Sequence, residues 1–126
     1  MVKILIIDDE ETICKSLKWT LENLGHEITY ALNYEDGKKL ILEQNFLLYF
    51  VDLILPGGSG IDLIRLIREK SSNGIIIIIT GYPNIPTLVD AVNQEVFDYL
   101  NKPITRKRVI EIVNHALEFN EKIKVN

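Results

Sequence analysis

The sequence predicts a single α/β domain over residues 1–126, built on a doubly wound five-stranded parallel sheet with helices on both faces. Its length suits one domain with one hydrophobic core. Short apolar runs alternate five times with segments whose apolar residues recur at helical spacing. Parallel strands need crossover connections, which are usually helices, so this alternation favours a parallel sheet over an antiparallel one.

The first strand is predicted over residues 3–8, where a continuous apolar run is typical of a strand covered on both faces. Asp9 can act as the N-cap of the following helix, and Gly25 ends that helix because glycine tolerates positive φ. Trp19 falls on the outer side, where it is either incidental or part of a partner surface. The inward face is predicted to hold Ile13, Leu17, Leu21 and Leu24.

Four further strand–helix units follow. The five isoleucines at 75–79 give the strongest strand signal, because β-branched side chains favour extended backbone. Thr105 can cap the last helix. The strands are predicted at 27–31, 47–52, 75–79 and 97–101, and the helices at 34–44, from Gly60 to 71–74, at 85–94 and at about 105–122. The helices are predicted to turn inward Leu40 and Ile41, then Ile61, Leu63, Ile64 and Ile67, and finally Val109, Ile112, Val113 and Ala116.

Composition and charge exclude several classes of protein. The chain is 47% hydrophobic and 25% charged, as is usual for a soluble domain. Its apolar runs are far shorter than the roughly 20 residues that cross a membrane. A net charge of −4 without a basic tail argues against nucleic-acid binding by this segment. The single cysteine, Cys14, excludes an internal disulfide and suits the reducing environment of a cytoplasmic protein. The basic run 106–108 is either a solvated face or a docking patch for an acidic or phosphorylated partner.

Polar residues follow the predicted strands at the same end of each. Asp8 and Asp9 end the first strand, Asp52 the third, Thr80 the fourth and Lys102 the fifth. In open α/β sheets the ligand site lies beyond the carboxyl ends of the strands. We therefore expect these side chains to meet at one edge of the sheet.

These residue types suit phosphoryl transfer. Carboxylates held together repel one another unless a cation intervenes, and Mg²⁺ prefers one or two carboxylates with waters and phosphate oxygens. Asp52 would then be the nucleophile, because phosphoryl transfer depends mainly on positioning and on neutralising charge. Taken singly, Asp9 is also explained as an N-cap, Thr80 as a strand end and Lys102 as a surface lysine.

Four motifs in order carry a resemblance that covers essentially the whole chain: "IIDDE" at 6–10, "VDLILPGGSG" at 51–60, "IIIITG" at 76–81 and "DYLNKP" at 98–103. The sequence resembles the receiver domain of bacterial two-component response regulators. The resemblance implies a flavodoxin-like sheet of strand order 2-1-3-4-5 and a bound Mg²⁺ ion. It also implies transfer of a phosphoryl group to an aspartate from the phosphohistidine of a histidine kinase or a phosphotransfer protein. Such a domain is not an enzyme beyond its own phosphorylation and dephosphorylation.

By position in the family pattern, Asp52 corresponds to the phosphoacceptor. The resemblance implies a metal ion held by Asp9 directly and by Asp8 through water. Asp52 and the backbone carbonyl of Ile54 complete the implied set of metal ligands.

Other positions correspond to the residues that bind the phosphoryl group and report it. Thr80 matches a hydroxyl that turns inward, and Lys102 matches the ammonium that pairs with the phosphoryl group. Gly81 would leave room for a phosphoryl oxygen at its N–H, and Pro103 is expected to follow a cis bond. Tyr99 matches the switch aromatic. The resemblance implies an output face formed by residues 85–94, 97–101 and 105–122, through which a homodimer could form.

The sequence departs from the family pattern in the loop after Asp52, where Ser59 replaces an acidic residue but can still cap the next helix. We hypothesise that Ile54 and Tyr82 restrict the water that hydrolyses the acyl phosphate. A haloacid-dehalogenase-type phosphatase would need an acid at Ile54, and a dinucleotide-binding module would need glycines where "DDEET" stands. The serious alternative is a receiver-like interaction module that works without phosphorylation.

Overall fold

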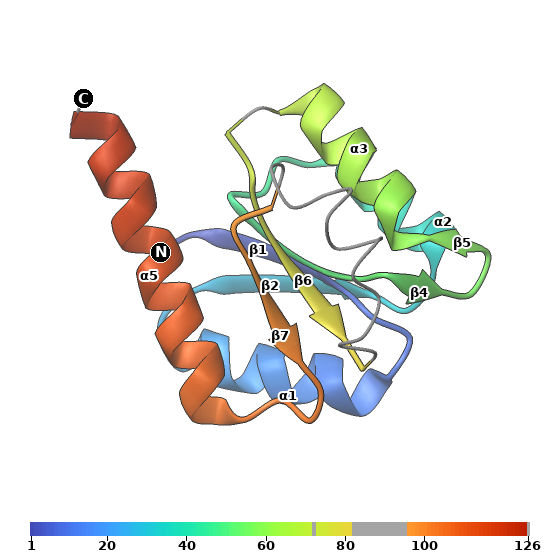
Figure 1. Cartoon of the computed structure of the whole chain (residues 1–126), viewed down its shortest axis with the longest axis horizontal. Helices are drawn as coiled ribbons and strands as arrows, with labels where there is room; N and C mark the ends of the chain where they lie inside the picture. The colour runs from blue at the N-terminus through green and yellow to red at the C-terminus, as the bar shows by residue number, and fades with distance from the viewer. Residues whose placement is uncertain (72, 82–95, 126) are drawn as a thin grey trace.

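Figure 1 shows the computed structural model, which describes residues 1–71, 73–81 and 96–125, with side chains described as far as residue 122. Five parallel strands form one sheet in the order β2-β1-β3-β6-β7, which confirms the predicted order 2-1-3-4-5. The strands are β1 (Lys3–Ile7), β2 (Glu27–Ala31), β3 (Leu48–Asp52), β6 (Ile75–Thr80) and β7 (Asp98–Asn101). The helices are α1 (Glu11–Glu22), α2 (Tyr34–Glu43), α3 (Gly60–Lys70) and α5 (Arg106–Val125). The helix predicted at 85–94 lies outside the described residues.

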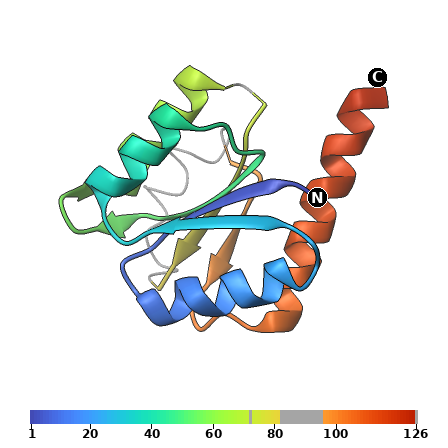
Figure 2. The ribbon, with the colours of Figure 1, turned by 180° about the vertical axis from the view of Figure 1, so that it is seen from behind.

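The helices cover the two faces of the sheet in pairs. Helices α1 and α5 lie on one face, and α2 and α3 lie on the other (Figures 1 and 2). Alternate residues of each strand enter the two cores, so Ile4 and Ile6 pack under α1 and α5 while Leu5 and Ile7 pack under α2 and α3. This two-sided burial explains why the strands read as unbroken apolar runs. No helix among the described residues is long and apolar enough to cross a bilayer.

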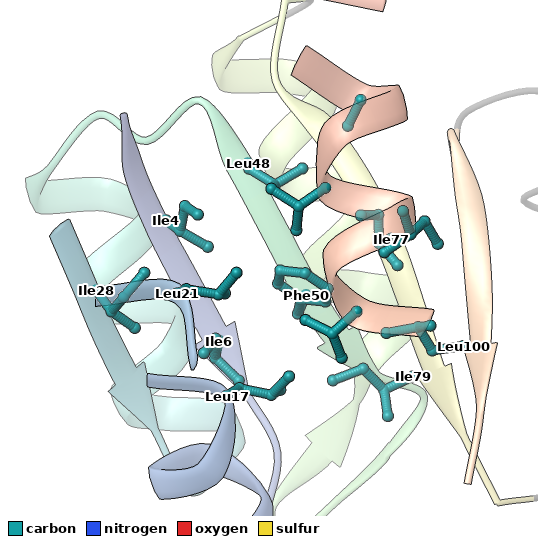
Figure 3. Packing of buried hydrophobic residues seen from close by; sticks show 14 of the residues in the cluster. Ile4, Ile6, Leu17, Leu21, Ile28, Leu48, Phe50, Ile77, Ile79 and Leu100 are labelled. Carbon is teal, nitrogen blue, oxygen red and sulfur yellow. The ribbon is translucent and has the colours of Figure 1, made fainter. Parts of the chain in front are cut away.

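Central strand β3 and the isoleucine strand β6 supply much of the core under α1 and α5. Phe50, Ile77 and Ile79 lie between β1 on one side and Leu100 of β7 on the other, under the helix α5 (Figure 3). All six residues of β6 are buried. Because each fully buried isoleucine contributes about 1.5–3 kcal/mol, a polar residue within this run would be costly.

Helix α1 differs from its prediction at both ends. Its N-cap is Glu10, which makes no side-chain capping hydrogen bond, so the prediction that Asp9 caps this helix was wrong. The helix ends at Glu22, one turn before the glycine, and Leu24 is 43% exposed rather than inward-facing. Leu24 lies in the turn that leads to Gly25, whose φ is +91°, so it no longer follows the helical spacing. Cys14, Leu17, Thr20 and Leu21 are the buried residues of the helix.

The other predicted caps are confirmed. The Ser59 hydroxyl accepts a hydrogen bond from the Ile61 N–H at 3.1 Å and caps α3. The Thr105 hydroxyl accepts one from the Arg108 N–H at 3.2 Å at the start of α5. These hydroxyls satisfy first-turn N–H groups that have no partner within their own helix.

A short hairpin follows Asp52, where the sequence predicted only a break in regular structure. Strands β4 (Ile54–Leu55) and β5 (Gly58–Ser59) pair antiparallel, as a two-stranded sheet of their own. The turn between them contains Gly57 with a φ of +88°, a conformation that favours glycine. This hairpin leads from Asp52 directly into α3.

Candidate functional site

The predicted polar residues meet at the carboxyl edge of the sheet. Asp8 follows β1, Asp52 ends β3 and Thr80 ends β6, and these three side chains are buried. Lys102 follows β7, and its N–H donates to the Thr80 carbonyl at 2.8 Å. The sheet order places β1, β3, β6 and β7 side by side, so strand ends far apart in sequence become neighbours.

The Lys102 ammonium lies among three carboxylates. Its Nζ is 3.0 Å from Asp52 Oδ2 and 3.2 Å from Asp8 Oδ2, and it also pairs with Glu10. Partial burial alone would lower the pKa of Lys102, but hydrogen bonds to Glu10 and Asp52 and the charge of Asp8 raise it above its ordinary value. Lys102 is therefore a permanent positive charge beside Asp52, and not a surface lysine.

Glu10 joins this cluster although the sequence analysis assigned it no role. Its N–H donates to Asp8 Oδ1 at 2.8 Å, and its carboxylate pairs with Lys102. The only signal in the sequence was its place directly after Asp8 and Asp9 in "IIDDE". Cys14 was also missed: its thiol donates to the Asp8 carbonyl at 3.3 Å, and burial raises the pKa of this thiol to about 12.

One oxygen of the Asp8 carboxylate lacks a hydrogen-bond donor among the described residues, although it pairs with Lys102. Burial raises the pKa of Asp8, and the neighbouring charge of Asp52 raises it further, against the lowering effect of the Glu10 N–H and of Lys102. Although Asp8 Oδ2 is within ion-pair distance of Lys102, it accepts no hydrogen bond of acceptable geometry from the described residues. A buried carboxylate oxygen without a donor is costly unless a cation faces it.

The residues present fit a hard divalent cation. Carboxylate oxygens of Asp8, Asp9 and Glu10 lie within 4.8 Å of one another, and the Asp9 and Glu10 side chains are exposed toward solvent. An all-oxygen set that leaves room for water is the environment that Mg²⁺ prefers. The Ile54 N–H donates to Asp52 Oδ1 at 3.0 Å, so the backbone of Ile54 lies next to the same carboxylate.

A cleft of about 310 Å³ opens beside Asp52. It is lined by Asp9, Glu10, Asp52, Ile54, Gly81 and Lys102. The side chain of Ile54 is 54% exposed at this cleft, while Tyr82 lies outside the described residues. A Cβ at position 81 would meet Lys102 Cδ at 3.6 Å, which is ordinary contact, so the space around Gly81 does not itself require glycine.

Of the predicted switch residues, Thr80 ends β6 and Tyr99 lies on β7, and the described part of the predicted output face lies on β7 and α5, while residues 85–94 lie outside the described residues. Tyr99 is 44% exposed, and the neighbouring Asp98 pairs with Arg108 of α5 at 3.3 Å. The Lys102–Pro103 bond is cis, as the sequence predicted. In the basic run of α5, the Arg106 guanidinium lies 5.1 Å from the centre of the exposed Trp19 ring. This is cation–π distance, so the basic run and Trp19 form one surface.

Known proteins resemble this chain in sequence along nearly its whole length. The profile of the response regulator receiver domain matches residues 4–114. The response regulator protein PilR of Pseudomonas aeruginosa is 34% identical over 115 residues, which make up 91% of this chain and 26% of PilR. The chain thus spans about a quarter of the length of that relative.

Solved structures resemble it in fold. A CheY-like receiver domain protein from Methanospirillum hungatei superposes with a TM-score of 0.88 at 29% identity, covering 95% of this chain and 96% of that one. A response regulator from Burkholderia pseudomallei, with a phosphorylated aspartic acid, a calcium ion and citrate, superposes with a TM-score of 0.79 at 30% identity. That match covers 98% of this chain and 73% of the Burkholderia protein.

Proposed function

Because the chain belongs to the family of response regulator receiver domains, we propose that Asp52 accepts a phosphoryl group from the phosphohistidine of a histidine kinase or a phosphotransfer protein. The observation that carries this proposal is the 3.0 Å contact between Lys102 Nζ and Asp52 Oδ2, two residues that line the cleft. Asp52 would be the nucleophile, and the Lys102 ammonium lies beside it. The chain's acceptor group and the incoming phosphoryl oxygens would both be negative, so this cation lowers their repulsion.

The transfer is a displacement at phosphorus. An Asp52 carboxylate oxygen forms the new P–O bond while the P–N bond of the phosphohistidine breaks, and the electron pair of the broken bond stays on the departing imidazole nitrogen. Asp52 needs no base because it attacks as a carboxylate. Lys102 then pairs with a phosphoryl oxygen, and the Thr80 hydroxyl and the Gly81 N–H are the donors that we assign to the others.

We assign Asp8, Asp9, Asp52 and the Ile54 carbonyl as the residues that would hold Mg²⁺. The bound ion would neutralise carboxylate and phosphoryl charge. The unsatisfied Asp8 oxygen and the acidic cluster around it support this assignment. The Burkholderia regulator, with both a phosphorylated aspartic acid and a calcium ion, also supports it.

We further propose that phosphorylation is reported through Thr80 and Tyr99. Tyr99 is 44% exposed, and its ring would turn inward when Thr80 turns toward the phosphoryl group. The face that includes β7 and α5 would then change, for an effector or for a second copy of the domain. We propose that the domain receives the phosphoryl group in the cytoplasm and that this segment itself binds neither nucleic acid nor membrane.

Chemical labelling tests the proposal. Acetyl phosphate with Mg²⁺ should label the wild-type domain, and intact mass should rise by one phosphoryl group. Asp52→Asn should stay unlabelled, while Asp62→Asn, an exposed acid on α3 that pairs with Arg65, should be labelled normally. Absence of label in the wild type, both from acetyl phosphate and from a phosphorylated histidine kinase, would favour an interaction module that works without phosphorylation.

A further inference from the structure

We propose that Tyr34 is a positioning residue for the phosphorylation site, because its ring holds the hairpin of β4 and β5 in the place that orients Asp52. This inference rests on the proposed function for its consequence, but its structural part stands on contacts between α2 and the hairpin. Tyr34 is the first residue of α2, and Figure 1 shows that helix beside β4 and β5.

The Tyr34 ring fills the space above Gly58. A Cβ on Gly58 would lie 2.5 Å from Tyr34 Cδ2 and 2.6 Å from Cγ, which no real Cβ tolerates. Gly58 does not have positive φ, so its backbone would accept alanine if the ring were absent. At Gly57, an added Cβ would lie 3.7 Å from the Tyr34 Cβ, which is ordinary van der Waals contact, so this part of the turn also packs against Tyr34. Gly58 therefore has to be glycine because residue 34 is tyrosine.

The backbone joins the same two elements. The Tyr34 N–H donates to the Pro56 carbonyl at 3.1 Å. A first-turn N–H has no partner within its own helix, so the hairpin supplies the acceptor that α2 lacks. The start of α2 is itself fixed by Asn33, whose side chain accepts from the Asp36 N–H at 2.8 Å. The ring and the N–H of one residue thus attach the hairpin to a capped helix end.

The hairpin in turn orients Asp52. Ile54 of β4 pairs with Ser59 of β5, and the Ile54 N–H donates to Asp52 Oδ1 at 3.0 Å. The backbone of Ile54 also carries the carbonyl assigned above to the metal. If the hairpin moves away from α2, the N–H that orients the nucleophile and the carbonyl that would bind Mg²⁺ move together. Tyr34 touches neither group and acts through the position of the hairpin.

The test is a double-mutant cycle on residues 34 and 58. Gly58→Ala should weaken Mg²⁺ binding by about 10-fold, the usual scale for a residue that supports metal ligands, and should speed amide hydrogen exchange at Ile54. Tyr34→Ala should have a smaller effect in the same direction. The double variant should bind Mg²⁺ as Tyr34→Ala does, because the new methyl group then enters vacated space. Calorimetry gives the affinity, and exchange measured by NMR gives the state of the hairpin.

Two controls separate positioning from loss of fold. Tyr34→Phe keeps the ring and should restore wild-type exchange at Ile54, and Tyr30→Ala removes a half-buried tyrosine from β2 without touching the hairpin. Equal damage by Gly58→Ala with and without Tyr34 would overturn the inference, as would unchanged exchange at Ile54 in the single variant. Wild-type protein that binds no Mg²⁺ would count against the assigned metal site alone, because the exchange arm still tests the hairpin.

Discussion

Lys102 sets the charge balance of the site at the scale of single residues. One ammonium faces the carboxylates of Asp8, Glu10 and Asp52, so the cluster keeps an excess of negative charge. Asp8 bears most of the cost, because it is fully buried and one of its oxygens has no hydrogen-bond donor in the part of the chain that the structure describes. We therefore expect the metal-free domain to be less stable than a variant with a neutral residue at position 8.

Asp8→Asn should stabilise the metal-free domain, by about 1–3 kcal/mol if it removes the desolvation cost of an unsatisfied buried group. The amide oxygen can keep the hydrogen bond from the Glu10 N–H. Denaturant unfolding in the presence of a chelator measures the change. The control is Asp62→Asn on the exposed face of α3, which should change stability little. Equal stability of Asp8→Asn and wild type would show that Lys102 already offsets the charge of Asp8.

The same carboxyl gives this prediction a pH dependence. The pKa of folded Asp8 is raised above its ordinary value of 3.8, so the folded state holds the proton more tightly than the unfolded chain does. The stabilising contribution of protonated Asp8 is complete below the unfolded pKa and is lost as pH rises through the folded pKa. The stability difference between Asp8→Asn and wild type should therefore grow as pH rises through that range, and a constant difference would contradict the assignment.

At the scale of elements, the helices differ in how they begin. Helices α2, α3 and α5 have side-chain caps from Asn33, Ser59 and Thr105, whereas the N-cap residue of α1, Glu10, makes no side-chain capping hydrogen bond. Glu10 contributes to the site instead, because its N–H donates to Asp8 and its carboxylate pairs with Lys102. The Glu10 carboxylate, which could otherwise cap α1, is therefore part of the site.

Ser59→Ala should lower stability by about 1 kcal/mol, the usual cost of losing an N-cap. Its hydroxyl accepts from the Ile61 N–H, and alanine leaves that donor without its partner. Thermal or denaturant unfolding measures the loss. Ser16→Ala on the exposed face of α1 is the matched control and should be neutral or slightly stabilising, since alanine is the better helix former. Equal effects of both substitutions would mean that the Ser59 cap contributes little.

At the scale of the whole molecule, the sheet order couples the site to overall stability. The assigned metal ligands Asp8 and Asp52 come from the ends of the neighbouring strands β1 and β3, so a cation bound there would hold these two strands together beside Lys102, which follows β7. Any ligand that binds only the folded state stabilises it by mass action.

Mg²⁺ at 100 times its dissociation constant should therefore raise the free energy of unfolding by about 2.7 kcal/mol. Thermal unfolding across a MgCl₂ series measures the effect. NaCl at matched ionic strength is the control, because salt alone screens repulsion between the carboxylates. A stabilisation by Mg²⁺ that NaCl reproduces, or that persists in Asp52→Asn at full size, would argue against specific binding at this site.

Most of the fold was predictable from local patterns. Apolar runs, helical spacing and the caps Ser59 and Thr105 are properties of short segments. Within the described residues, each predicted strand and helix formed within a few residues of its predicted bounds. The errors lay at helix ends. Leu24 continues the apolar spacing of α1, but it is exposed because the helix has already ended at Glu22. Asp9 has a side chain that can cap a helix, but the N-cap position belongs to Glu10.

The sequence by itself determined the parallel α/β architecture and the strand-end residues Asp8, Asp52, Thr80 and Lys102. The spacing of apolar residues and the polar residue that ends each apolar run are both visible within short segments. Only the tertiary structure decided that Glu10 pairs with Lys102, that one oxygen of Asp8 has no donor among residues 1–71, 73–81 and 96–122, and that the Tyr34 ring occupies the space where a side chain at Gly58 would lie. These features depend on distances between side chains far apart in the chain. Such distances follow from how the elements pack, which no local pattern contains.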